Sequence, residues 1–357
     1  EARLAGSWAQ PYLAERLHQD LTGHPTIRPG YAPDSWNALI RHLHEQGITH
    51  DEMLTAGVAK VASSGHAIDR FRDRLVFPIN HEGQVLGFVA RRNPQYTEAD
   101  QHGPKYLNTP ETALFHKGDQ LYVVPGSSVA TPVLVEGPMD AIAITLATNG
   151  THFGVAPLGT SLTEAQARQL GKSRQRVTVA TDADPAGRQA AERDFWLVTP
   201  HGIHTDYARL PDGSDPADLL THRQVNSLVT ALRDTRPLGT YLIEAQLTHG
   251  SDANQLSRSI QILAASSPIE WAHGIDTIAE LSDIPAGVIR CALAAEVKAW
   301  NEDPSRAAAF ARRTPRSPKQ AQPLGAMDRI QSDSASRPRH ELPPPDRRSG
   351  RSGHPAR

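Results

Sequence analysis

Between Thr131 and Leu220 the sequence alternates short apolar runs with amphipathic segments, and this alternation restricts the fold more than any other feature. Helices are expected at 139–147, from Thr163 and from Ala186, and Thr163 with Gln166 forms a capping box. Strands that alternate with helices imply an α/β fold, with a mostly parallel sheet covered by helices on both faces. The predicted strands are VLV, FGVAP, VTVAT and the apolar part of TDYARL.

The segments on either side of this sheet have different patterns. Leu75–Ile79 and Gln84–Ala90, separated by the turn NHEG, predict a β-hairpin. The stretch SWNALIRHLHEQGI predicts a helix with Trp36, Leu39, Ile40, Leu43 and Ile48 near one face. Residues 221 to about 301 read as helices, and the remainder is rich in Pro, Ser and Arg.

Four regions therefore follow from the pattern. The tail has too little apolar content to pack, so we expect it to be disordered. The expected regions are a mixed α+β amino-terminal lobe at 1–125, the sheet domain at 131–220, a small helical subdomain at 221–302 and the disordered tail at 303–357.

Composition excludes several classes of protein. The chain has 357 residues, and no apolar run approaches the roughly 20 residues of a membrane-spanning helix. Cys291 is the only cysteine, which excludes an internal disulfide and the usual zinc sites. We therefore expect a cytoplasmic protein without zinc in this chain. Because the sequence begins with Glu1 instead of Met, we expect a piece of a longer polypeptide.

The net charge of −2 is unevenly distributed. From Asp303 onward there are 12 Lys/Arg against 5 Asp/Glu, so the preceding part is net acidic. An acidic body can hold cations at a focused site while a local basic patch binds phosphate. Motifs of P-loop ATPases, zinc proteases and serine hydrolases are absent from the sequence, and His42 with His44 is expected on an exposed helix face.

Acidic residues follow three of the predicted strands. In an open α/β sheet, ligand sites form beyond the carboxyl ends of the strands, so these side chains should meet at one edge. Gathered carboxylates repel one another unless a divalent cation neutralises them, and their oxygens suit Mg²⁺ or Mn²⁺. The residues are Glu136 and Asp140, Asp182 and Asp184, and Asp215 and Asp218.

A structural interpretation is open for four of them. Asp184 and Asp215 each precede a proline and suit the N-cap of a helix. Asp140 and Asp218 suit a first helical turn, where the macrodipole favours negative charge. Capping explains neither Glu136 nor Asp182, so the six acids together indicate metal binding better than any one of them.

These residues carry a resemblance. EGPMD at 136–140 and DADPAG at 182–187 are similar to the two signatures of the TOPRIM domain, which bacterial primases share with topoisomerases and some nucleases. Upstream, RFRDRLVFPINHEGQVLGFVARR and GPKYLNTPETALFHKGDQLY resemble the catalytic core of bacterial DnaG-type primases, and so does GYAPDSWNALIRHLHEQGITHDEMLTAG. LPDGSDPADLL resembles the third acidic motif of that family. The resemblance covers about Pro11 to Leu220.

The resemblance implies a DNA primase, a nucleotidyltransferase that makes short RNA primers on single-stranded DNA during replication. It implies two or more Mg²⁺ or Mn²⁺ ions, ribonucleoside triphosphates as substrates, a replicative or transfer helicase as partner and no membrane. Within this chain it assigns catalysis to Glu136, Asp182 and Asp184, and metal binding to these three with Asp215 and Asp218. Asp140 would support the site, and four basic residues would bind template or nucleotide: Arg74, Arg91, Lys105 and Lys117.

Two departures from the family pattern stand out. The third motif has Ala217 where the family has a second acid, and Asp218 lies one residue on, about 100° away on a helix. The family's zinc ribbon has no counterpart here, so it precedes Glu1 or another module replaces it. The segments EGPMDAIAITLA and AERDFWLVTPHG are similar to actinobacterial mobile-element proteins with relaxase or helicase domains. Two alternatives stay open: a TOPRIM nuclease, and a non-catalytic single-stranded DNA- or nucleotide-binding module of a plasmid-transfer protein.

Overall fold

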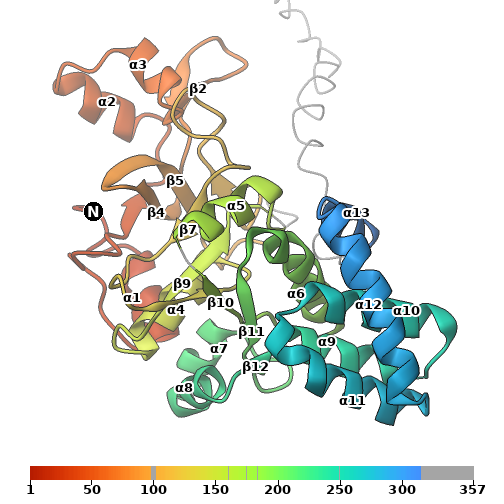
Figure 1. Cartoon of the computed structure of the whole chain (residues 1–357). Coiled ribbons are helices and arrows are strands. Elements are labelled where there is room, and N and C mark those ends of the chain that lie inside the picture. Colours follow the sequence, from red (N-terminus) through yellow and green to blue (C-terminus); the bar gives the residue numbers. More distant parts are fainter. Residues whose placement is uncertain (98–101, 160, 174, 183, 249, 315–357) are drawn as a thin grey trace, which may run out of the picture. The chain divides into compact units, whose positions relative to one another are not determined.

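The computed structural model (Figure 1) describes residues 1–314 except 98–101, 160, 174, 183 and 249. The described residues belong to one unit, 1–320. Within them, no helix combines the length and the apolar character that crossing a membrane requires.

A six-stranded sheet forms the centre of the fold, in the order β12-β11-β10-β8-β9-β7. The four inner strands are parallel, and the edge strands β7 and β12 run antiparallel to their neighbours. This arrangement confirms the predicted mostly parallel sheet. The strands are β7 (Leu121–Val123), β8 (Thr131–Leu134), β9 (His152–Pro157), β10 (Arg176–Val179), β11 (His204–Tyr207) and β12 (Arg236–Pro237).

Successive residues of the inner strands enter two different cores. Leu134 and Val179 pack into one core, whereas the residues that follow them, Val135 and Ala180, pack into the other. On the side of Val135 lie α1 (Ala9–Leu17), α4 (Pro138–Ala147), α7 (Pro216–Thr221) and α8 (Val225–Arg233). On the side of Leu134 lie α5 (Glu164–Ser173), α6 (Pro185–Val198) and the carboxy-terminal helices. Both faces of the sheet are therefore covered, as the uninterrupted apolar strands require.

The amino-terminal lobe contains a second sheet, which is antiparallel with the order β1-β4-β5-β6. Its central pair is the predicted hairpin. The strands are β1 (Gly30–Ala32), β4 (Arg74–His81), β5 (Gln84–Arg92) and β6 (Tyr106–Asn108). A smaller cluster is built from α2 (Ala38–Glu45), α3 (His50–Thr55), β2 (Ala59–Val61) and β3 (Ala67–Asp69), with Ile40, Met53 and Ala59 at its centre.

The helix predicted around Trp36 is shorter than expected. Buried Asp69 accepts hydrogen bonds from the backbone N–H groups of Leu39 (2.8 Å) and Ile40 (3.0 Å), which satisfies the first turn of α2. Trp36 lies before this turn and is 63% exposed, and Ile48 lies beyond the helix end. The prediction that both lie on one helical face with Ile40 was therefore wrong.

Helices at the carboxy-terminal end pack on α6, as Figure 1 shows in teal and blue.

The sequence analysis predicts a disordered tail from residue 303. This start is too early, because 306–313 forms the helix α13. Phe310 of α13 packs on Trp196 with ring centroids 4.7 Å apart, and Arg306 pairs with Glu296 at 2.7 Å. The rest of the tail, 315–357, lies outside the described residues, and the predicted domain boundaries stay a prediction. The remaining elements are η1 (Thr199–His201), α9 (Leu238–Leu247), α10 (Ala253–Ala265), η2 (Pro268–Glu270), α11 (Trp271–Ser282), α12 (Ala286–Glu302) and α13 (Arg306–Arg313).

Helix α4 packs against β9 at Gly154, where a Cβ atom would lie 2.0 Å from the carbonyl oxygen of Ala141. Gly154→Ala should therefore force the helix away from the sheet and lower the free energy of unfolding by about 1–3 kcal/mol or more. Urea unfolding followed by circular dichroism measures this change. Gly118→Ala is the control, because no atom lies within 4 Å of its added Cβ. Equal stabilities of the two variants would contradict the close packing.

Candidate active site

The neighbouring strands β8 and β10 define where a site can form. The connection after β8 leads into α4 on one face of the sheet, and the connection after β10 leads into α6 on the other face. Connections that diverge in this way open a crevice at the carboxyl ends of the strands. Glu136 follows the end of β8, and Asp182 follows the end of β10. Both residues therefore lie at the crevice.

The surroundings of Asp140 show that acidic residues from different strand ends lie close together. It lies in the first turn of α4, and its Oδ1 accepts a hydrogen bond from the backbone N–H of Ala217 in α7 at 3.4 Å. Burial raises the pKa of Asp140 well above its usual range, and the negative charges of Asp215, Asp182 and Glu136 raise it further. Carboxylates from three strand ends thus act on one another, as the sequence predicted.

Asp184 and Asp215 are both N-caps. Asp184 accepts the backbone N–H of Gly187 at 2.8 Å, and Asp215 accepts the backbone N–H of Asp218 at 2.6 Å. The capping interpretation is thus confirmed for both residues. Capping fixes the direction of each carboxylate, and a carboxylate held in this way can still bind a metal ion through its second oxygen. A Cβ on Gly187 would lie 1.9 Å from the carbonyl oxygen of Asp182, so only glycine lets α6 begin this close to Asp182.

Asp218 has a partner that the sequence did not indicate. Its Oδ1 accepts a hydrogen bond from Arg16 Nη1 of α1 at 2.5 Å, and Arg16 Nη2 lies 3.9 Å from Asp215. Asp218 is therefore paired with the guanidinium group of Arg16 in this structure. The binding of metal by Asp218 stays a prediction, and Arg16 is a residue beside these acids that the sequence analysis did not name.

Lys105 and Arg91 form a cationic wall beside the acids. Burial lowers the pKa of Lys105, the charge of Arg91 lowers it further, and the charges of Asp140 and Asp215 oppose this. Arg91 donates a hydrogen bond to the hydroxyl of Tyr106 at 2.8 Å. The structure therefore brings Lys105 close to Asp140 and Asp215, with Arg91 beside Lys105.

Lys117 lies farther along the same edge of the sheet. Its side chain packs against Gly159, beyond the end of β9, with the side-chain Cε 3.5 Å from the place of a Cβ on that glycine. Burial lowers the pKa of Lys117, and the charge of Glu111 opposes this. Lys117 therefore lies beyond the end of β9, and its binding of template or nucleotide stays a prediction.

Arg74 is the one predicted template- or nucleotide-binding residue that is buried. Its side chain is 3% exposed, and the guanidinium donates hydrogen bonds to the carbonyl oxygens of Ala90, Pro104 and His102. Burial lowers the pKa of Arg74 to about 10, and the charge of Arg92 contributes. Arg74 therefore fastens the segment after β5 to the hairpin, and its role in binding template or nucleotide stays a prediction.

Arg72, two residues before Arg74, is partly exposed and contacts an aromatic ring. Its guanidinium carbon is 3.9 Å from the ring centroid of Trp36, which is largely exposed. Sequence reasoning missed this pair because it placed Trp36 within a helix, on the same face as Ile40. The run RFRDR does not reveal the pair either, because residues two apart in an extended segment lie on the same face, which would place Arg72 with Arg74.

The acidic group fits a divalent cation in its donor chemistry. Among the described residues, no three Asp, Glu, His or Cys side chains are already grouped as ligands of one ion. Buried polar atoms without a hydrogen-bond partner lie beside the group: Tyr12 Oη, Arg16 Nε and Thr181 Oγ1. Such atoms are rare in proteins and suit a polar ligand.

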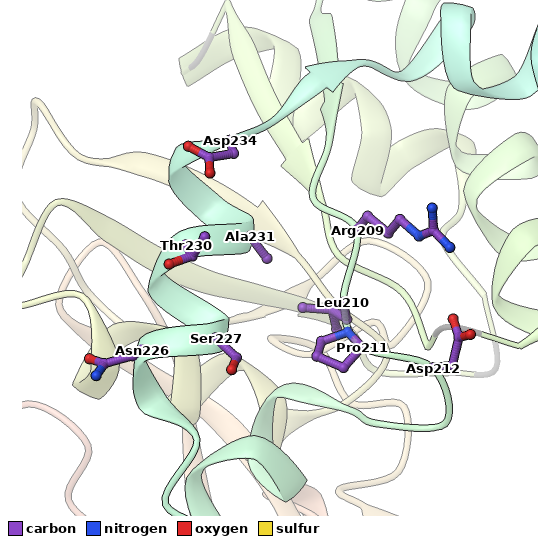
Figure 2. A pocket seen from close by; sticks show the side chains of 9 residues that line it. All are labelled: Arg209, Leu210, Pro211, Asp212, Asn226, Ser227, Thr230, Ala231 and Asp234. Atoms are coloured by element: carbon purple, nitrogen blue, oxygen red, sulfur yellow. The ribbon is translucent and has the colours of Figure 1, made fainter.

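A surface groove of about 670 Å³ lies elsewhere, between the segment after β11 and α8 (Figure 2). Leu210 points toward α8, whereas Arg209 points away from it. Ser227 and Asp234 are among the lining residues, and none of the acids described above is. The candidate site is therefore defined by the acidic residues at the strand ends, and this groove is a separate feature of the surface.

Comparisons with known proteins agree with this geometry. Residues 3–127 match the family model "DNA primase catalytic core, N-terminal domain", and residues 133–220 match the model "Toprim-like". The chain is 32% identical to a DNA primase of Clostridium acetobutylicum over 71% of this chain and 40% of the relative. It is 34% identical to a DNA primase of Escherichia coli K12 over 66% of this chain and 41% of the relative. The chain thus spans about two fifths of the length of these relatives.

The fold also has a close counterpart among solved structures. The RNA polymerase domain of Mycobacterium tuberculosis primase, solved in complex with a double-stranded DNA oligomer with a 6-nucleotide overhang, is 27% identical. It aligns with a TM-score of 0.65 over 80% of this chain and 94% of that domain. The chain therefore belongs to the family of DnaG-type DNA primase catalytic cores, with the amino-terminal domain of that core followed by a Toprim-like domain.

Proposed function

We propose that this chain synthesises short RNA primers on single-stranded DNA by metal-dependent nucleotidyl transfer. The observation that carries the proposal is the convergence of Glu136, Asp182 and Asp215 on Asp140 from three strand ends. The charges of Asp140 and Asp215 act on Lys105, and Arg91 lies beside Lys105, which supports neighbouring sites for cations and for phosphate. Nucleotidyl transfer requires this pairing, because the triphosphate and the metal must be held together.

The roles of the acids follow from their positions. Glu136, Asp182, Asp184 and Asp215 would hold the Mg²⁺ or Mn²⁺ ions, which supply Lewis acidity and neutralise developing charge when bound. Asp140 acts differently: its contact with the N–H of Ala217 holds α7, and with it Asp215, beside the end of β8. Ribonucleoside triphosphates would meet Lys105 and Arg91, with Lys117 contacting phosphate from the side of β9.

The template would also contact the amino-terminal lobe. Trp36 offers an exposed ring, and Arg72 supplies a positive charge at its face. Aromatic rings stack on unpaired bases, and arginine attracts the backbone, so this pair suits single-stranded DNA. The backbone of Trp36 is fixed because its carbonyl accepts the N–H of Asp69 at 2.7 Å. In the family, a solved polymerase domain bound to DNA supports a nucleic-acid ligand.

Primer synthesis is tested directly with single-stranded DNA, labelled ribonucleotides and Mg²⁺ or Mn²⁺. The wild-type chain should produce RNA oligomers, and Asp182→Asn should reduce synthesis at least about 100-fold because a metal ligand is lost. Asp276→Asn is the matched control, since this exposed residue of α11 belongs to the helical subdomain. Both variants should keep the wild-type circular dichroism spectrum.

The same assay distinguishes the alternatives. A shortened template that depends on Asp182 would identify a nuclease. Unchanged template that is retarded on a gel, without RNA product in either metal, would identify a binding module. Either result would overturn the proposal.

Asp184 allows capping to be separated from metal binding. Asp184→Ser keeps an N-cap oxygen for the N–H of Gly187, whereas Asp184→Ala removes it. The alanine variant should lose about 1 kcal/mol of unfolding free energy and the serine variant little. Primer synthesis should be nearly abolished in both, because neither side chain carries charge. An active Asp184→Ser variant would show that Asp184 only caps α6.

Trp36 provides a test of template binding. Trp36→Ala should weaken binding of a fluorescein-labelled single-stranded oligonucleotide about tenfold, as expected for the loss of one stacked base. Fluorescence anisotropy measures this affinity. Trp36→Phe retains an aromatic face and should bind nearly as tightly as the wild type. If the alanine variant also binds normally, the template does not contact this part of the lobe.

A further inference from the structure

Helix α1 presents two polar side chains toward the acidic group. Tyr12 and Arg16 are four residues apart and therefore share one face of the helix, beside the buried Leu13 and Leu17. The end of α1 is fastened to α7, because the hydroxyl of Thr221 donates a hydrogen bond to the carbonyl oxygen of Arg16 at 3.1 Å. The two side chains are thus held rigidly relative to Asp215, which caps α7.

The ring of Tyr12 is fixed on two sides. Trp8 packs edge-on against it with centroids 5.8 Å apart, and the guanidinium carbon of Arg91 lies 5.2 Å from its centroid. Its hydroxyl is buried and, among the described residues, has no hydrogen-bond partner. Nε of Arg16 is buried without a partner in the same way. Since buried polar atoms are nearly always hydrogen-bonded, two such donors on one helix face indicate a ligand.

The surrounding charges indicate what kind of ligand it is. The charges that act most strongly on the Tyr12 hydroxyl are those of Arg91 and Arg16, and Asp140 and Asp215 act less strongly. A hydroxyl between two guanidinium groups is a donor in a locally positive environment, which favours an anionic oxygen. Nε of Arg16 can only donate, so it requires an acceptor as well. A phosphate oxygen satisfies both groups.

We propose that the Tyr12 hydroxyl and Nε of Arg16 together bind a phosphate group of the substrates, beside the acids at the carboxyl ends of the strands. The inference rests on the proposed primer synthesis and adds a binding residue that the sequence did not indicate. The phosphate belongs either to the triphosphate of a nucleotide or to the template backbone. Both have the same chemistry, and separate binding measurements distinguish them.

Tyr12→Phe tests the inference because it removes only the hydroxyl. Binding of adenosine 5′-(α,β-methylene)triphosphate with Mg²⁺ is measured by calorimetry, and binding of a fluorescein-labelled single-stranded oligonucleotide is measured by anisotropy. One of the two dissociation constants should rise about tenfold, as expected for a lost hydrogen bond to a charged group. In primer synthesis, KM for the affected substrate should rise while kcat stays near the wild-type value.

Tyr241→Phe is the matched control, because Tyr241 belongs to α9 and its ring stacks on that of Tyr207 with the centroids 4.0 Å apart. It should leave both dissociation constants unchanged. Arg16→Lys is the second variant, since it keeps the charge and removes the Nε donor; it should weaken the same ligand as Tyr12→Phe.

The outcomes separate this inference from the proposed function. A raised nucleotide constant assigns the phosphate to the triphosphate, and a raised oligonucleotide constant assigns it to the template. If neither constant changes in Tyr12→Phe, the inference is wrong even where the wild type makes RNA. If the wild type binds the nucleotide but makes no RNA, the proposed function fails while the binding result for Tyr12 stands.

Discussion

Repulsion between carboxylates at one edge of a parallel sheet is the constraint on which the rest of the site depends. Asp140 is half-buried beside Asp215, Asp182 and Glu136, and this crowding is unfavourable unless positive charge balances it. The amino-terminal lobe supplies part of that charge through Arg91 and Lys105. The two lobes are therefore linked by electrostatics as well as by the shared core that contains Phe77 and Ile142.

Several side chains at this edge have a structural and a chemical role at the same time. Asp184 and Asp215 begin α6 and α7, and the capping bonds orient the carboxylates that would hold metal. Gly187 permits α6 to begin against the carbonyl of Asp182. Because the helix starts position the acids, the geometry of the site is inherited from the strand–turn–helix units of the sheet.

The basic residues show where sequence patterns reach their limit. Arg72 and Arg74 lie two residues apart in one run, yet Arg74 is buried among carbonyl oxygens whereas Arg72 lies against an exposed tryptophan. Composition and spacing do not distinguish such neighbours. Which of them meets solvent depends on the segment that packs above the hairpin, and that packing is a property of the folded chain.

The sequence by itself determined the parallel sheet, the hairpin, the capping box of α5 and the acids at the strand ends, because each is written in a local pattern of a few residues. Only the tertiary structure decided that Asp218 pairs with Arg16, 202 residues away, and that Tyr12 faces the acids. It also decided that α13 packs on Trp196. Such contacts depend on how distant elements pack, and neither periodicity nor spacing records which surfaces will meet.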